Sequence, residues 1–127
     1  MKKILIVSAN YYENISDNIF LNANKILKNK FKIKIIKVPG VFEIPVVISK
    51  LIKNYDGCIA IGCVIKGQTP HFEFISRAVN NGIMNLSIKH KKPIANAILT
   101  CLNKKQALSR IKKGSEAAKA LISVLSI

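Results

Sequence analysis

The residues best suited to chemistry lie in the segment GCVIKGQTPHFEF, at positions 62–74. An apolar strand is predicted to end here, the chain turns at Gly67, and Thr69 and His71 follow at the start of a helix. Backbone amides in a turn and at a helix N-terminus bind anions such as phosphate. A histidine side chain can exchange a proton near neutral pH. The segment therefore predicts a site that combines phosphate binding with proton transfer.

The other predicted strands also end in residues of unusual character. Tyr11 and Tyr12 follow the first strand, the segment PGVFEIP at 39–45 follows the second, and Thr100 ends the fourth. Loops at the carboxyl ends of parallel strands meet at one edge of the sheet, where α/β proteins bind their ligands. Each feature alone has a plainer explanation, such as a simple turn at 39–40 or a helix cap at His71. Their combination predicts a common pocket.

Alternating apolar strands and amphipathic helices predict an α/β protein with a single domain over residues 1–127. Ser16 is expected to cap the first helix, which runs to Leu27. Such an order forms a three-layer α/β/α sandwich around a four-stranded parallel sheet that is doubly wound. The strands are predicted over 2–8, 31–38, 56–64 and 93–100, and the later helices over 41–54, 71–90, 104–111 and 115–125.

Composition narrows the class of protein. Half of the 127 residues are hydrophobic, yet no apolar run approaches the ~20 residues of a membrane span. The start, MKKILIV, reads as a first strand and not as a signal peptide, so we expect a cytoplasmic protein with no membrane partner. The three cysteines show no metal-binding spacing, which favours reduced core cysteines over a metal site.

The net charge of +15 raises the question of nucleic-acid binding. Only Arg77 and Arg110 are arginines, and the lysines are scattered along the chain, not gathered beside stacking aromatics. This pattern favours a solvated lysine surface, which would still attract small anionic substrates. We therefore predict no nucleic-acid partner.

Three segments resemble the signature segments of the 6,7-dimethyl-8-ribityllumazine synthase family. They are VPGVFEIP at 38–45, GCVIKGQTPHFEF at 62–74 and PIANAILTCLNKKQALSR at 93–110, and the resemblance is collinear from about Ile4 to Leu125. It implies a flavodoxin-like fold and the penultimate step of riboflavin synthesis. In that step 5-amino-6-(D-ribitylamino)uracil condenses with 3,4-dihydroxy-2-butanone 4-phosphate, with release of phosphate and water. The resemblance implies no cofactor.

The resemblance also implies roles for individual residues. His71 matches the family's proton donor, and Arg110 matches the arginine that clamps the substrate phosphate. The other matching positions bind substrate: Tyr11 stacks on the pyrimidine; Val41, Phe42 and Glu43 hold the ribityl chain and ring edge; Cys63, Val64 and Ile65 line the pyrimidine pocket; Gln68 and Thr69 bind the butanone phosphate; Asn96 contributes its backbone; and Lys113 reaches the substrate.

The resemblance further implies a homo-oligomer whose active sites are shared between adjacent subunits, either a pentamer or a sixty-subunit shell of pentamers. Two features depart from the family pattern. The stretch from Arg110 to Gly114 is several residues shorter than in many members, and Asn96 replaces a common phenylalanine.

Other readings of the same fold remain open from the sequence. An archaeal-type riboflavin synthase would share the fold but consume two lumazines, and His71 with the PGVFE segment favours the first reaction. A flavin-binding carrier would need a Ser/Thr/Gly-rich loop after the first strand, where this chain has SANYYE at 8–13. A purely structural shell protein would not need His71 and Arg110.

Overall fold

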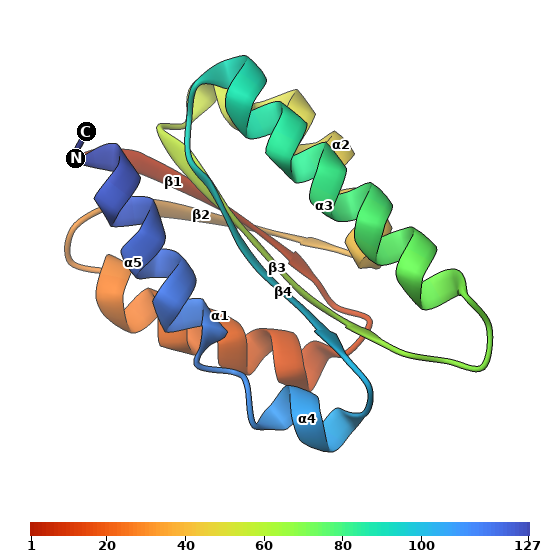
Figure 1. Ribbon diagram of the computed structural model, residues 1–127. Helices are drawn as coiled ribbons and strands as arrows, with labels where there is room; N and C mark the ends of the chain where they lie inside the picture. The colour runs from red at the N-terminus through yellow and green to blue at the C-terminus, as the bar shows by residue number, and fades with distance from the viewer.

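The computed structural model describes all 127 residues and shows a parallel sheet between two layers of helices (Figure 1). The four strands are β1 (Lys3–Ala9), β2 (Lys32–Val38), β3 (Gly57–Ile65) and β4 (Ile94–Cys101). They lie in the order β2-β1-β3-β4, and every neighbouring pair is parallel. The predicted α/β class and four-stranded parallel sheet are confirmed.

The helices cover both faces of this sheet. Helices α1 (Glu13–Leu27), α4 (Lys104–Leu108) and α5 (Lys113–Leu125) lie on one face, and α2 (Ile44–Leu51) and α3 (His71–His90) lie on the other (Figure 1). Two single 3-10 turns, η1 (Val41–Glu43) and η2 (Ile52–Asn54), flank α2, so the predicted helix over 41–54 is divided into three pieces. None of the helices combines the length and apolar character needed to cross a bilayer.

The sheet separates two hydrophobic cores. Successive side chains of a strand point to opposite faces. Ile4 and Ile6 therefore pack towards α1 and α5, whereas Leu5 and Val7 pack towards α2 and α3. Because both faces are covered, residues 4–9 of β1 are all buried, as expected for a central strand of a parallel sheet.

The predicted role of Ser16 as a helix cap is wrong. Helix α1 begins three residues earlier, and Tyr12 occupies the cap position without a side-chain hydrogen bond. The buried Ser16 hydroxyl instead donates a 2.6 Å hydrogen bond to the carbonyl oxygen of Ala9. This bond ties the first turn of α1 to the end of β1 and so shapes the loop that carries the two tyrosines.

The segment after β4 also differs from the prediction. Helix α4 ends at Leu108, so Arg110 lies in a turn between α4 and α5 and not within a helix over 104–111. The amide of Arg110 donates to the carbonyl oxygen of Ala107, and the amide of Lys113 donates to that of Arg110, both at 3.0 Å. Two consecutive tight turns thus replace the last turn of the expected helix.

Replacing Gly114 by alanine should destabilise the fold severely. A Cβ at this position would collide with the carbonyl oxygen of Ile19, so α5 could no longer lie against α1. Because that obstacle is backbone, we expect a loss of about 3 kcal/mol or more in the free energy of unfolding, measured by urea denaturation.

Gly82→Ala is the matched control, since it adds the same methyl group to a helix. Its Cβ would lie 3.3 Å from the ring carbons of Pro45, and alanine gains about 1 kcal/mol of helix propensity. We expect little net change. Equal stability losses in the two variants would contradict the proposed α1–α5 contact.

Candidate active site

A cavity of about 320 Å³ lies where the strand order reverses. Strand β1 has β2 on one side and β3 on the other, so the connections that leave β1 and β3 run in opposite directions. Doubly wound sheets bind their ligands at such a point, outside the carboxyl ends of the strands. We call it the switch-point cavity. Seven predicted site residues line it together with Tyr12, Gly40 and Ile75: Tyr11, Val41, Phe42, Cys63, Val64, Ile65 and His71.

One wall of the switch-point cavity depends on a close approach between η1 and β3. A Cβ on Gly62 would lie 2.5 Å from Cγ1 of Val41, so only glycine lets this turn pack on the strand. Val41 is consequently buried, while the next residue, Phe42, leaves 61% of its surface exposed at the cavity. Glycine in the strand therefore sets where the apolar wall stands.

Two tyrosines form another wall. The rings of Tyr11 and Tyr12 meet edge to face, with centroids 4.9 Å apart and planes at 82°. Tyr11 is 76% exposed, whereas Tyr12 is half-buried against the core beneath α1. An exposed aromatic ring beside an apolar cavity is suited to stacking on a planar ligand.

His71 is the first residue of the 20-residue helix α3, and it is exposed at the mouth of the cavity. The positive end of the helix dipole lies at the same place. The preceding loop is anchored where the Lys66 amide donates a 2.9 Å hydrogen bond to the carbonyl oxygen of Cys101. Gln68 and Thr69 lie exposed in this loop and do not line the cavity.

The cysteines are unpaired and buried, which confirms the prediction of free core thiols. Burial, and to a smaller extent the neighbouring Cys101, raises the pKa of the Cys63 thiol to about 11. Burial also raises the pKa of Cys58 above its usual range. At neutral pH Cys63 is therefore a protonated, apolar part of the cavity wall and not a nucleophile.

Arg110 and Lys113 line a different cavity of about 470 Å³ at the open edge of β4. We call it the basic hollow; Thr100, Cys101, Ser109, Lys112 and Glu116 are among its other lining residues. It shares no residue with the switch-point cavity, although Val64 and Thr100 are register partners on adjacent strands. One copy of the chain thus does not bring His71 and Arg110 into one cavity.

Asn96 and Glu43 lie outside both cavities. The Asn96 amide nitrogen donates a 2.8 Å hydrogen bond to Oδ1 of Asn80 on α3, and its own Oδ1 accepts one from the Ile98 amide. The side chain of Asn96 is therefore occupied within the protomer, which leaves its backbone as the part available to a substrate. Glu43 is half-buried, with its carboxylate folded back beside Gly40.

Several lining residues were not among the predicted site residues. Ile75 lies one helical turn after His71, a spacing that the sequence does show. Tyr12 follows Tyr11 directly in a loop, where the sequence does not indicate which way two successive side chains point. It therefore did not predict that both tyrosines face the cavity. Lys112 and Glu116 reach the basic hollow only because of the turns before α5.

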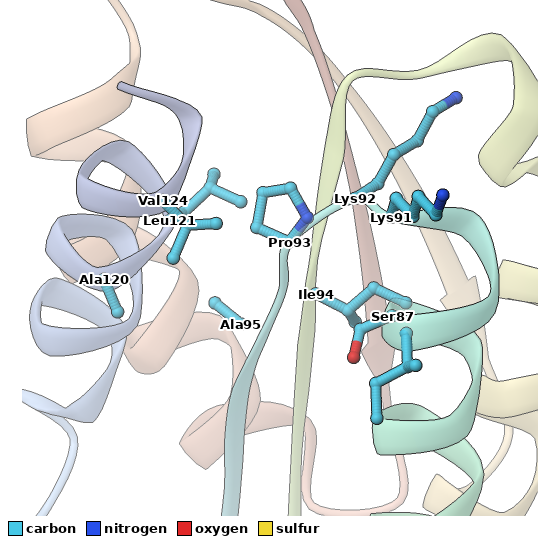
Figure 2. Close-up of a pocket in the computed structure, with 10 residues that line it drawn as sticks. Ser87, Lys91, Lys92, Pro93, Ile94, Ala95, Ala120, Leu121 and Val124 are labelled. Atoms are coloured by element: carbon cyan, nitrogen blue, oxygen red, sulfur yellow. The ribbon is translucent and has the colours of Figure 1, made fainter. Parts of the chain in front are cut away.

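A third cavity, of about 410 Å³, lies at the other end of β4 (Figure 2). It is lined by the end of α3, the start of β4 and one face of α5, and the side chains of Leu121 and Val124 point toward Pro93. It contains no predicted site residue, and it adjoins the amino end of the strand, where doubly wound sheets do not bind their ligands. No three His, Cys, Asp or Glu side chains gather into a metal-binding group anywhere in the chain.

A doubly wound sheet with an aromatic cavity and a histidine at its switch point is typical of α/β enzymes that act on small molecules. The sequence model of 6,7-dimethyl-8-ribityllumazine synthase matches residues 1–127. The chain therefore belongs to the 6,7-dimethyl-8-ribityllumazine synthase family, whose members are transferases of riboflavin biosynthesis. Neither a flavin carrier nor an archaeal-type riboflavin synthase is favoured by this match.

Individual relatives agree with the family match. A 6,7-dimethyl-8-ribityllumazine synthase of Mycolicibacterium paratuberculosis is 39% identical over 93% of this chain and 79% of its own length. Enzymes of the same name from Buchnera aphidicola and Novosphingobium aromaticivorans are also 39% identical. These two alignments cover 99% and 100% of this chain, and 87% and 96% of the relatives.

Gly62→Ala should displace the η1 wall and weaken the fold. The added Cβ overlaps Val41, so we expect a loss of about 1–3 kcal/mol in the free energy of unfolding, measured by urea denaturation. The double variant Gly62→Ala with Val41→Ala lacks the methyl group that overlaps. The free energy of unfolding should therefore fall by less in the double variant than the sum of the decreases in the two single variants.

Gly67→Ala is the control, because a Cβ there meets nothing within 4 Å. It should leave the free energy of unfolding nearly unchanged. Simple additivity of Gly62→Ala and Val41→Ala would show that the two positions do not press on each other.

Proposed function

We propose that the switch-point cavity binds 5-amino-6-(D-ribitylamino)uracil and that this chain condenses it with 3,4-dihydroxy-2-butanone 4-phosphate. The products are 6,7-dimethyl-8-ribityllumazine, phosphate and water. The observation that carries the proposal is the cavity itself. It combines an exposed aromatic ring, a neutral apolar wall and His71 at the switch point of a chain in this family.

The pyrimidine ring is proposed to stack on Tyr11 and to pack against Cys63, Val64 and Ile65, which form an apolar strand end. The ribityl chain would extend along Val41, Phe42 and Glu43. This arrangement needs no protein nucleophile, because the amine of one substrate attacks the ketone of the other. Holding both substrates in the reacting geometry can remove on the order of 7–11 kcal/mol of the barrier at best.

His71 is proposed to pass protons as the carbinolamine loses water, a role worth about 10²–10⁴-fold in rate. Its exposure at the start of α3 leaves the imidazole free to reach a bound intermediate. Gln68 and Thr69, in the loop just before it, would hold the butanone phosphate beside the helix N-terminus. The net charge of +15 would attract this anionic substrate from solution.

Arg110 and Lys113 are proposed to complete the site from a neighbouring copy of the chain. A planar guanidinium offers the phosphate two parallel hydrogen bonds, which favours arginine over lysine as the clamp. Within one protomer these residues line the basic hollow and not the switch-point cavity. Such a shared site, with the backbone of Asn96 also supplied by the neighbour, requires a homo-oligomer. The resemblance to the family makes a pentamer, alone or within a sixty-subunit shell, the assembly that we propose.

A cytoplasmic location is part of the same proposal. The three free cysteines support it, since thiols persist in reducing compartments.

The reaction itself is tested by mixing purified protein with the two substrates and recording the absorbance of the lumazine product. His71→Ala should lower kcat by about 10²-fold or more with little change in either KM. Arg110→Ala should instead raise the KM for the butanone phosphate about tenfold, as loss of one charge-assisted contact to a phosphate predicts. Unchanged kinetics in both variants would refute these roles.

Shared sites are tested by co-assembling His71→Ala and Arg110→Ala chains in equal amounts after denaturation and refolding. With random mixing, about a quarter of the sites would combine an intact His71 with an intact Arg110 from the adjoining chain. With butanone phosphate far below its KM, activity should therefore rise about two- to threefold above that of Arg110→Ala refolded alone, which by itself keeps about a tenth of the unmodified rate under these conditions. If each site belonged to a single chain, the mixture would give only the average of the two variants.

A further inference from the structure

Tyr12 contacts both the proposed stacking residue and a lysine from another element. Its ring meets Tyr11 edge to face at 4.9 Å. The Lys104 ammonium of α4 lies 5.8 Å from the Tyr12 ring centroid, within range of a cation–π interaction. The three residues thus form a chain of contacts from α4 to the switch-point cavity.

Tyr11 has little else to fix its ring. It is 76% exposed, and its one aromatic neighbour is Tyr12. A fourth cavity, of about 260 Å³, adjoins the pair and is lined by both tyrosines, the start of α1, Lys104 and Leu108. Because there is open space on both sides, the Tyr11 ring could swing away from the switch-point cavity unless its neighbour restrains it.

Tyr12 is better placed to be rigid. It is half-buried and packs against the core beneath α1, and the adjoining backbone is held by the Ser16–Ala9 hydrogen bond. Desolvation, with smaller contributions from Tyr11 and Cys63, raises the pKa of the Tyr12 hydroxyl. The hydroxyl therefore stays protonated at neutral pH and is a weaker acid than that of an exposed tyrosine. The contacts of Tyr12 with Tyr11 and Lys104 are made by its ring.

We propose that Tyr12 is a positioning residue for the pyrimidine substrate: its ring, braced by Lys104, holds the Tyr11 ring in the orientation that stacks on the pyrimidine. This inference rests on the proposed function and on the proposed role of Tyr11. Helix α4 contributes no residue to the lining of the switch-point cavity. The inference nevertheless gives it a part in recognising the pyrimidine substrate, through Lys104.

The test measures KM for each substrate and kcat separately in the intact enzyme. Tyr12→Leu should raise the KM for the pyrimidine substrate by roughly 2–10-fold, the equivalent of one edge-to-face contact. The kcat and the KM for the butanone phosphate should stay within about twofold, since neither depends on Tyr11 in this account. Tyr12→Phe retains the ring and should behave like the unmodified enzyme.

The decisive comparison is made in a Tyr11→Leu background. If Tyr12 acts through Tyr11, Tyr12→Leu should add no further increase in KM once Tyr11 is gone. If the two effects multiply, Tyr12 acts independently of Tyr11, and if both KM values rise together it acts on the fold as a whole. Either result overturns the proposal.

Two exposed lysines on α4 provide a test that leaves the core untouched. Lys104→Gln should raise the pyrimidine KM about twofold, Lys104→Arg should not, and Lys105→Gln is the matched control that removes the same charge one residue away. Equal effects of Lys104→Gln and Lys105→Gln would mean that net charge, not the contact with Tyr12, is responsible.

Calorimetric titration with the pyrimidine substrate separates this proposal from the proposed reaction. Dissociation constants measured without the second substrate should follow the same order as the KM values. If the unmodified enzyme bound the pyrimidine but formed no lumazine, the proposed function would be refuted. The role of Tyr12 would still be tested by the dissociation constants of the variants. Equal affinities in the unmodified enzyme and Tyr12→Leu would reject that role.

Discussion

The parallel arrangement of the four strands is the constraint on which the rest of the structure depends. Because every strand runs in the same direction, the four carboxyl ends meet at one edge and bring four separate loops together there. Each connection must also cross back over the sheet. Because these crossovers are right-handed and run in opposite directions on the two sides of β1, their helices cover both faces. Burial of the sheet and formation of the switch-point cavity therefore follow from one topology.

Small residues then decide how closely the layers approach. Gly62 lets the η1 turn pack on β3, and Gly114 lets α5 pack on the backbone of α1. The first contact sets the apolar wall of the switch-point cavity. The second fixes the start of α5, and with it the turns that carry Arg110 and Lys113 to the basic hollow. Close packing at two glycines thus positions both halves of the proposed site.

Electrostatics favours the separation of the proposed site into two cavities. The switch-point cavity is mainly apolar and aromatic, which suits a planar ring, whereas the basic hollow collects Arg110, Lys112 and Lys113. If all these cations lay beside the ring pocket of one chain, they would be desolvated and would repel one another without a substrate. On the exposed edge of β4 they remain hydrated, and in the proposed assembly they would lose this hydration only when a phosphate and a second chain are bound.

Much of this protein can be read from the amino-acid sequence, because the signals are local. The apolar runs predict the four strands to within one or two residues, and the 71–90 helix was predicted with the bounds that the structure has. The signature segments around His71 and Phe42 led to the family without any coordinates. Such patterns can be recognised in the sequence because periodicity and short motifs depend only on residues close together in the chain.

Contacts between distant segments were decided by the tertiary structure alone. The sequence suggested a cap at Ser16, but the hydroxyl bonds to the end of β1, because α1 begins earlier and turns that residue towards the sheet. Nor did the sequence show that Tyr12 would lie under Lys104, 92 residues away, or that Arg110 would face a different cavity from His71. These relations depend on how packed layers fit together, and residue order alone does not specify that fit.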